Sequence, residues 1–170
     1  MSSVDSRSDL DLRGHAMAEI TMHEANRWLL RCLDSVAASG FALQAELTSS
    51  RGEEALFELT RETLMGLLNF TSVGFLWFDE DGLDYTLGYC YPPECRDDLL
   101  REAEYQVDKD IFGWAVSQSR PIVSSSKSPG HKTMLRVLST RERDLGMFVG
   151  IIQENVVPDA ALKLVSIVLL

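Results

Sequence analysis

Residues 73–78, with the sequence VGFLWF, carry no polar side chain except the indole nitrogen of the tryptophan. A strand with one face in water alternates apolar and polar residues, whereas a strand covered on both faces has a continuous apolar run. The segment therefore predicts a strand that is buried on both faces. Any sheet that contains it needs a layer of structure on each side, which limits the chain to layered folds.

The rest of the pattern predicts helices at both ends of the chain and antiparallel strands between them. We expect helices over residues 16–47, 53–68, 93–103, 111–119 and 159–170. We expect further strands at 83–90, 104–107, 120–123, 134–139 and 146–152, with a loop at 124–130. This order predicts an α+β fold with an antiparallel sheet of five to six strands. The terminal helices would cover one face, and the short helices and the loop would cover the other and enclose a space.

A length of 170 residues predicts one globular domain with a helical extension. Residues 1–14 are small, polar and mixed in charge, so we expect a flexible tail there. Residues 15–50 are expected to form an N-terminal helix for dimerisation, and residues 51–170 the domain itself. Because the last helix ends on apolar residues, we expect it to continue past residue 170 into an effector domain.

Apolar residues spaced three and four apart follow one face of the N-terminal helix, as in a short coiled coil. Together with the apolar last helix, this spacing predicts a parallel homodimer. The expected interface consists of Met22, Ala25, Leu29, Cys32, Val36, Leu162, Val165 and Leu169. Two heptads are few, so a helix that packs only on its own core remains the alternative.

The net charge and the lack of targeting signals limit the classes of partner that the protein can have. The net charge is −10, and this sign opposes binding to nucleic acid and to anionic lipid surfaces, which bind through clustered Lys and Arg. The N-terminal residues do not resemble a signal peptide or a membrane anchor. Three cysteines without a pattern do not suit a disulfide scaffold. We therefore expect a cytoplasmic protein with no nucleic-acid or membrane partner.

The ordered series of elements resembles a GAF domain, the small-molecule sensor module of signalling proteins, over about residues 53–170. The resemblance rests on the helix and strand of residues 57–78, the sequence FGWAVSQSRPIV at 112–123, the closing strand GMFVGII at 146–152 and the exit helix at 158–170. The related PAS fold has a similar layout, but the helices before the first strand and after the last favour GAF. The resemblance implies a regulatory domain that senses an unidentified small molecule, with no activity of its own; the cofactor is unknown.

Candidate ligand-binding residues lie on the central strands, the short helix and the loop, because pockets are mostly apolar and aromatic with a few polar groups. They are Phe75, Trp77, Tyr89, Phe112, Trp114, Lys127, His131, Met134 and Phe148. Residues 120–143 carry six basic side chains and one acidic one, a local inversion of charge that would attract an anion. Solvated strand edges are the plainer explanation of these charges.

Catalytic and metal-binding patterns are missing from the sequence: the three histidines have no partners at the spacing of a metal site. Two alternatives to the sensor remain. Cys90 and Cys95 leave open a thiol-dependent enzyme of GAF type, such as a reductase of free methionine sulfoxide. The acidic residues that surround Cys95 favour an inert thiol. The other alternative is a dimerisation module without a ligand.

Overall fold

The computed structural model describes residues 27, 28, 30, 31, 33 and 34 together with residues 52–79, 84–153 and 156–169. The predicted tail and most of the predicted N-terminal helix lie outside these ranges, as do residues 80–83. The predicted dimer residues Met22, Ala25, Leu29, Cys32 and Val36 also lie outside them. Within the described ranges, none of the helices has the length and apolar character needed to cross a bilayer.

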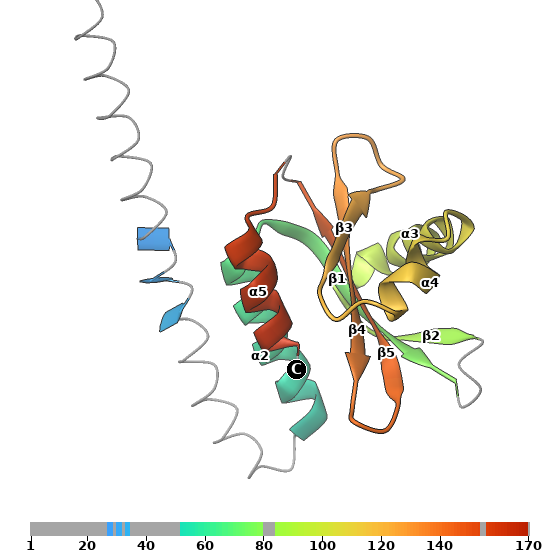
Figure 1. Ribbon diagram of the computed structural model, residues 1–170, viewed down its shortest axis with the longest axis horizontal. Helices are drawn as coiled ribbons and strands as arrows, with labels where there is room; N and C mark the ends of the chain where they lie inside the picture. Colours follow the sequence, from blue (N-terminus) through green and yellow to red (C-terminus); the bar gives the residue numbers. More distant parts are fainter. Residues whose placement is uncertain are drawn as a thin grey trace, which may run out of the picture.

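Five antiparallel strands form one sheet in the order β2-β1-β5-β4-β3, and helices lie on both of its faces (Figure 1). The elements follow the chain as α2 (Gly52–Leu67), β1 (Phe70–Phe78), β2 (Tyr85–Tyr91), the 3₁₀-turn η1 (Pro93–Cys95), α3 (Arg96–Asp108), α4 (Ile111–Val116), β3 (Ile122–Ser125), β4 (Lys132–Ser139), β5 (Asp144–Ile152) and α5 (Asp159–Val168). The predicted α+β class with an antiparallel sheet is confirmed.

One predicted strand, at residues 104–107, is wrong, because these residues form the end of α3. The buried residues of α3 are Leu99, Glu102, Ala103 and Gln106, spaced as the inner stripe of a helix. Two of these four are polar, so the stripe does not stand out as apolar in the sequence. The sheet formed by the described residues consequently has five strands.

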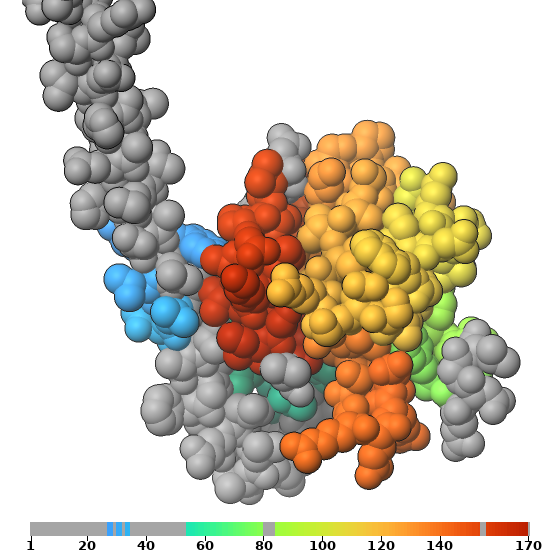
Figure 2. All heavy atoms as spheres, in the orientation of Figure 1, coloured from blue at the N-terminus to red at the C-terminus, as the bar shows by residue number. Residues whose placement is uncertain are grey.

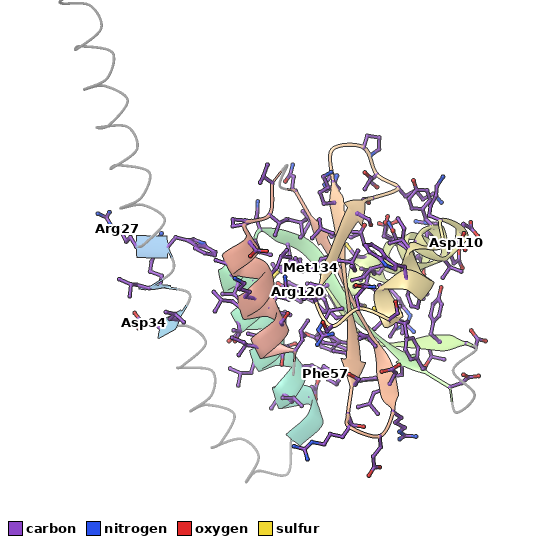
Figure 3. The ribbon with its side chains drawn as sticks, viewed as in Figure 1. Arg27, Asp34, Phe57, Asp110, Arg120 and Met134 are labelled. Carbon is purple, nitrogen blue, oxygen red and sulfur yellow. The ribbon has the colours of Figure 1, made fainter. Side chains whose placement is uncertain are left out.

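The first face of the sheet is covered by α2 and α5, which contact each other (Figure 1). Phe75, Met134 and Phe148 from the central strands pack there with Leu64 of α2 and Val165 of α5. Figure 3 shows Phe57 and Met134 in this layer. Of the described N-terminal residues, Trp28 packs on the same cluster, and Figure 2 shows these residues beside α5.

The second face is covered by α3 and α4, which contact each other and the strands β1, β2 and β4. The buried residues of this layer are Leu76, Leu87, Leu99, Ala103, Phe112, Ala115, Leu135, Val137, Met147, Val149 and Ile151. Asp110, in the turn between α3 and α4, lies on this side of the molecule in Figure 3. Successive residues of β1 and β5 thus enter opposite layers, as a strand buried on both faces requires.

A cluster of rings and charges fastens α2 to the edge of the sheet. Phe57 stacks on Tyr89, with ring centroids 5.2 Å apart and an angle of 14° between the planes. The Tyr89 hydroxyl donates a 2.6 Å hydrogen bond to Oε1 of Glu58, and Arg61 donates a 2.7 Å bond to Oε2 of the same carboxylate. The Arg61 guanidinium also lies 4.2 Å from the ring centroid of Tyr91. Each contact joins the helix to β2 or orders a group that does.

This cluster predicts a loss of stability in alkali. Burial, reinforced by the bonded carboxylate of Glu58, raises the pKa of Tyr89 to about 12. In the unfolded chain a tyrosine has a pKa of about 10, so the folded state holds this proton more tightly. The resulting stabilisation is fully present below about pH 10 and is lost as the pH rises through about 12.

The free energy of unfolding in urea, measured from about pH 8 to about pH 12, should therefore fall more steeply for the unmodified chain than for Tyr89→Phe. The Glu58→Gln variant keeps an acceptor but removes the charge, and should give an intermediate decline. Equally steep declines in all three proteins would show that the Tyr89 hydroxyl does not carry the effect.

Candidate functional site

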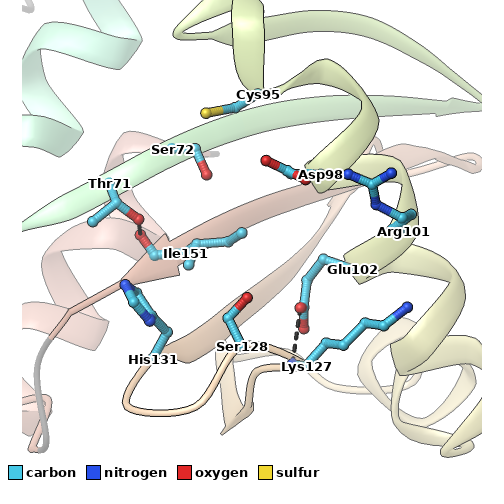
Figure 4. Close-up of a pocket in the computed structure, with 10 residues that line it drawn as sticks. All are labelled: Thr71, Ser72, Cys95, Asp98, Arg101, Glu102, Lys127, Ser128, His131 and Ile151. Atoms are coloured by element: carbon cyan, nitrogen blue, oxygen red, sulfur yellow. Dashed lines mark hydrogen bonds and ion pairs between the residues drawn. The ribbon is translucent and has the colours of Figure 1, made fainter.

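A cavity of about 350 Å³ lies on the second face of the sheet, between α3, the first residues of β1 and the loop that joins β3 to β4 (Figure 4). Most of the residues that line it are of polar types, although their carbon atoms form much of the wall. The lining residues are Thr71, Ser72, Cys95, Asp98, Arg101, Glu102, Lys127, Ser128, His131 and Ile151. The apolar run of β1 begins just after Ser72, so the cavity lies where the apolar layer under α3 ends.

Helical spacing brings three of these residues to one side of α3. Asp98, Arg101 and Glu102 are separated by three and one positions, so they lie on adjoining turns above the cavity. Asp97 and Asp98 lie in the first turn, where the helix dipole favours negative charge. Asp98 forms an ion pair with Arg101, and both side chains are more than half exposed.

Glu102 is only 2% exposed, and its carboxylate is the centre of a buried hydrogen-bond network. Its Oε1 accepts bonds from the Thr133 hydroxyl at 2.6 Å and the Gln106 amide at 2.7 Å. Its Oε2 accepts bonds from the Ser126 hydroxyl at 2.8 Å and the Lys127 backbone N–H at 3.0 Å. Buried charge is costly unless hydrogen bonds compensate it, and here each oxygen has two donors.

The same network fastens the β3–β4 loop to α3. Gln106 donates to the carbonyl of Ser125 at 3.0 Å and accepts from the Ser124 hydroxyl at 2.8 Å. Within the loop, the His131 N–H donates to the Ser128 carbonyl, and Gly130 has a φ of +79°, a left-handed conformation that suits glycine. The loop wall of the cavity therefore has a defined position relative to α3.

Cys95 lies in the cavity wall, and its thiol is not activated. Burial raises the pKa of the Cys95 thiol, and the charges of Asp98 and Glu94 and the neighbouring Cys90 raise it further. A reactive thiol needs the opposite shift. Among the described residues, Cys90 and Cys95 are free cysteines, and no group of three His, Cys, Asp or Glu side chains could hold a metal ion.

The structure separates the nine predicted ligand-binding residues into three places. Lys127 and His131 line the cavity. Most of the aromatic and apolar candidates pack under α2 and α5 on the other face, where their rings contact one another: these are Phe75, Trp77, Tyr89, Met134 and Phe148. Phe112 is buried beneath α4, and Trp114 on the same helix is 54% exposed.

The predicted interface residues of α5 face inward. Val165 and Leu169 are buried in the core of their own chain, and Leu162 packs partly against it. The apolar side chain that α5 exposes is Ile167, at 56%. The reason is that α5 lays its most apolar stripe on the sheet, so only the opposite side of the helix is open to a partner.

The basic side chains of residues 120–143 also lie in different parts of the structure. Lys127 reaches the cavity, whereas Arg136 is 7% exposed on the first face, where its guanidinium donates to the Gln118 carbonyl at 3.4 Å. Burial lowers the pKa of Arg136. The six basic residues therefore do not act as one patch.

Sequence reasoning missed the contribution of α3 to the cavity. A signal was present: Glu102 and Gln106 occur in register with Leu99 and Ala103, so two polar residues occupy positions of the inner stripe. Polar groups at such positions need buried partners, and the run of Ser and Thr at 124–126 and 133 supplies them.

No family model matches the sequence, and no curated protein is significantly similar to it.

The Glu102 network predicts a specific loss of stability and order. Glu102→Gln replaces one acceptor oxygen by an N–H₂ group that faces other donors, so we expect the free energy of unfolding to fall by about 2–4 kcal/mol. Exchange of the Lys127 amide hydrogen should accelerate, because that N–H bonds to the carboxylate. The control is Glu104→Gln, an exposed position of the same helix, with an expected change within about 0.5 kcal/mol. Equal effects of the two substitutions would contradict the proposed network.

Proposed function

We propose that this chain is a ligand-sensing regulatory domain of GAF type from a signal-transduction protein. The layered arrangement supports the proposal: α2 and α5 lie together on one face of a five-stranded antiparallel sheet, and the short helices and a loop lie on the other. This is the arrangement that the order of helices and strands in the sequence predicted, and the resemblance to GAF domains was drawn from that order.

The observation that carries the proposal is the cavity of about 350 Å³ under α3. This volume is at the lower end of the range for small-molecule sites, so it suits a metabolite of modest size. Its lining combines hydroxyls, charged groups and one aliphatic wall, a set that orients a polar ligand. The Cys95 thiol in its wall has a raised pKa, which suits an inert lining group better than a nucleophile.

The layers provide a route for the signal. The cavity walls belong to α3, β1, β5 and the β3–β4 loop, and β1 also contacts α2 on its other face. A ligand that prefers one arrangement of α3 and the loop shifts the population toward that arrangement. Because the central strands are shared by both layers, the shift changes the packing beneath α2 and α5, which would transmit it to an effector domain.

The proposed sensor is a homodimer through its terminal helices. Apolar side chains remain exposed on that side: Ile167 on α5 at 56%, Leu56 on α2 at 37%, and Leu30 and Leu33 at 63% and 47%. Exposed apolar groups of this kind on adjoining helices favour a helical interface with a second copy.

Ligand binding can be tested by filling the cavity. Ser72 is 3% exposed and lines the cavity, so Ser72→Leu would occupy part of the space without removing a contact of the core. The unmodified chain should gain thermal stability from at least one member of a panel of amino acids, dicarboxylates and nucleotides. Ser72→Leu should abolish that gain, and Ser139→Leu, at an exposed strand position, should preserve it.

Two outcomes would favour the alternatives. A chain that no compound stabilises would be a dimerisation module without a ligand. Free methionine sulfoxide belongs in the panel because Cys95 lines the cavity. Its reduction to methionine by the chain with an added dithiol as the reductant, lost in Cys95→Ser, would make the protein a thiol-dependent enzyme.

The dimer can be tested on α5. Ile167→Asp places a charge on the exposed side of the helix and should convert the dimer to a monomer at micromolar concentration, as measured by sedimentation velocity. The matched control is Val107→Asp, because Val107 is 44% exposed on α3. This second variant should remain a dimer. A dimer that survives Ile167→Asp would exclude this side of α5 from the interface.

A further inference from the structure

The two sides of the cavity differ in the groups that they present. Figure 4 shows the Asp98 carboxylate pointing into the cavity from α3, close to Ser72. His131 and Ser128 approach from the loop on the opposite side. The α3 wall thus presents Asp98 together with its ion-pair partner Arg101, and the loop presents an imidazole, a hydroxyl and Lys127.

The acids of the cavity are not equivalent. Both oxygens of Glu102 are occupied by hydrogen bonds from the protein. Oδ1 of Asp98 accepts a hydrogen bond from the Arg101 guanidinium. Oδ2 has no hydrogen-bond or ion-pair partner among the described residues. Asp98 is therefore the acid that remains available to a cationic group of a ligand.

Ser72 presents a hydroxyl group to the cavity. The residue is 3% exposed, and its hydroxyl makes no hydrogen bond to another residue in the described part of the chain. The buried side-chain polar atom without a partner among the described residues is Nε of Arg136, so the Ser72 hydroxyl is open to the cavity rather than sealed in the core. Because this hydroxyl points into the cavity beside Asp98, a ligand with a polar group at that point would satisfy it.

The loop wall suits an anionic group. The Nδ1–H of His131 donates to the Pro129 carbonyl at 3.3 Å, so a ligand carboxylate can bond to this ring only through the Nε2–H that the imidazolium form carries. The Ser128 hydroxyl, on the same loop, also points into the cavity. Ile151 forms the aliphatic floor between the two walls.

On these observations, which rest on the proposed sensor function, we propose that the cavity binds a free amino acid as a zwitterion. Its ammonium group bonds to Asp98 and the Ser72 hydroxyl, its carboxylate bonds to His131 and Ser128, and its aliphatic carbons lie against Ile151. A dicarboxylate would place a negative charge against Asp98, and a diamine would leave the loop wall without an anion. Both are disfavoured.

The test uses thermal shift followed by titration calorimetry on the whole chain. The probes are the twenty standard L-α-amino acids and the ω-amino acid 4-aminobutyrate. Comparing them shows whether the site prefers ammonium and carboxylate groups on one carbon or further apart. For the amino acid that binds best, the analogues without the ammonium group and without the carboxylate are titrated as well. Each analogue should bind at least about tenfold more weakly, because a bond to a charged group is lost.

Matched variants assign the contacts. Asp98→Asn should weaken binding of that amino acid by about tenfold or more, whereas Asp97→Asn should leave it unchanged, since Asp97 is an exposed neighbour that does not line the cavity. His131→Gln should weaken binding of the amino acid and have no effect on binding of its amine analogue. Equal affinities for Asp98→Asn and the unmodified chain would overturn the assignment.

Failure of this inference is distinguishable from failure of the proposed function. If a dicarboxylate or a nucleotide binds, amino acids do not, and Ser72→Leu blocks the binding, the sensor stands and the zwitterion assignment is wrong. If no compound binds, both are wrong.

Discussion

The central strands β1 and β5 are apolar on both faces, and the rest of the structure follows from the need to cover them. Each face requires its own helical layer, because neither can be left in water at the cost of about 25 cal/mol for each Å² of apolar surface. On the first face α2 and α5 complete this cover with a continuous set of aromatic and aliphatic side chains around Phe75 and Phe148. That layer is mainly apolar, although it also contains the buried guanidinium of Arg136, and it brings α2 at the start of the domain into contact with α5 at its end.

The second face is covered differently, and the difference creates the candidate site. Leu99 and Ala103 of α3 pack on the sheet, but the next inward positions of the helix are Glu102 and Gln106. These polar residues bond to the β3–β4 loop instead of to apolar side chains of the sheet. Where β1 changes from its apolar run to Ser72, the apolar contact ends and a polar cavity remains. Stability of the loop and the shape of the cavity therefore depend on the same carboxylate.

Local patterns predicted the fold class well and the site poorly. Strand alternation and helix spacing depend on neighbouring residues, so the antiparallel sheet and the helices at both ends could be predicted. The strand expected at 104–107 is helical because a buried stripe containing Glu102 and Gln106 does not look apolar in a linear sequence. Of the candidate ligand residues, Lys127 and His131 line the cavity, whereas Trp77 and Tyr89 pack under α2. Aromatic residues indicate that a position is buried. Because both faces of the sheet are buried, they do not indicate which face contains the cavity.

The sequence by itself determined the two-sided burial of β1, the shared face of Phe75 and Trp77, and the class of fold, because these depend on the period of a strand and on residues close together in the chain. Only the tertiary structure decided which helices cover which face. It also decided that Thr71 and Ser72 of β1 meet Asp98 of α3 and His131 of the loop around one cavity. These residues come from separate elements, and their meeting depends on how the chain crosses the sheet, which no local pattern encodes. The same crossing buries Val165 and Leu169 and leaves Ile167 exposed.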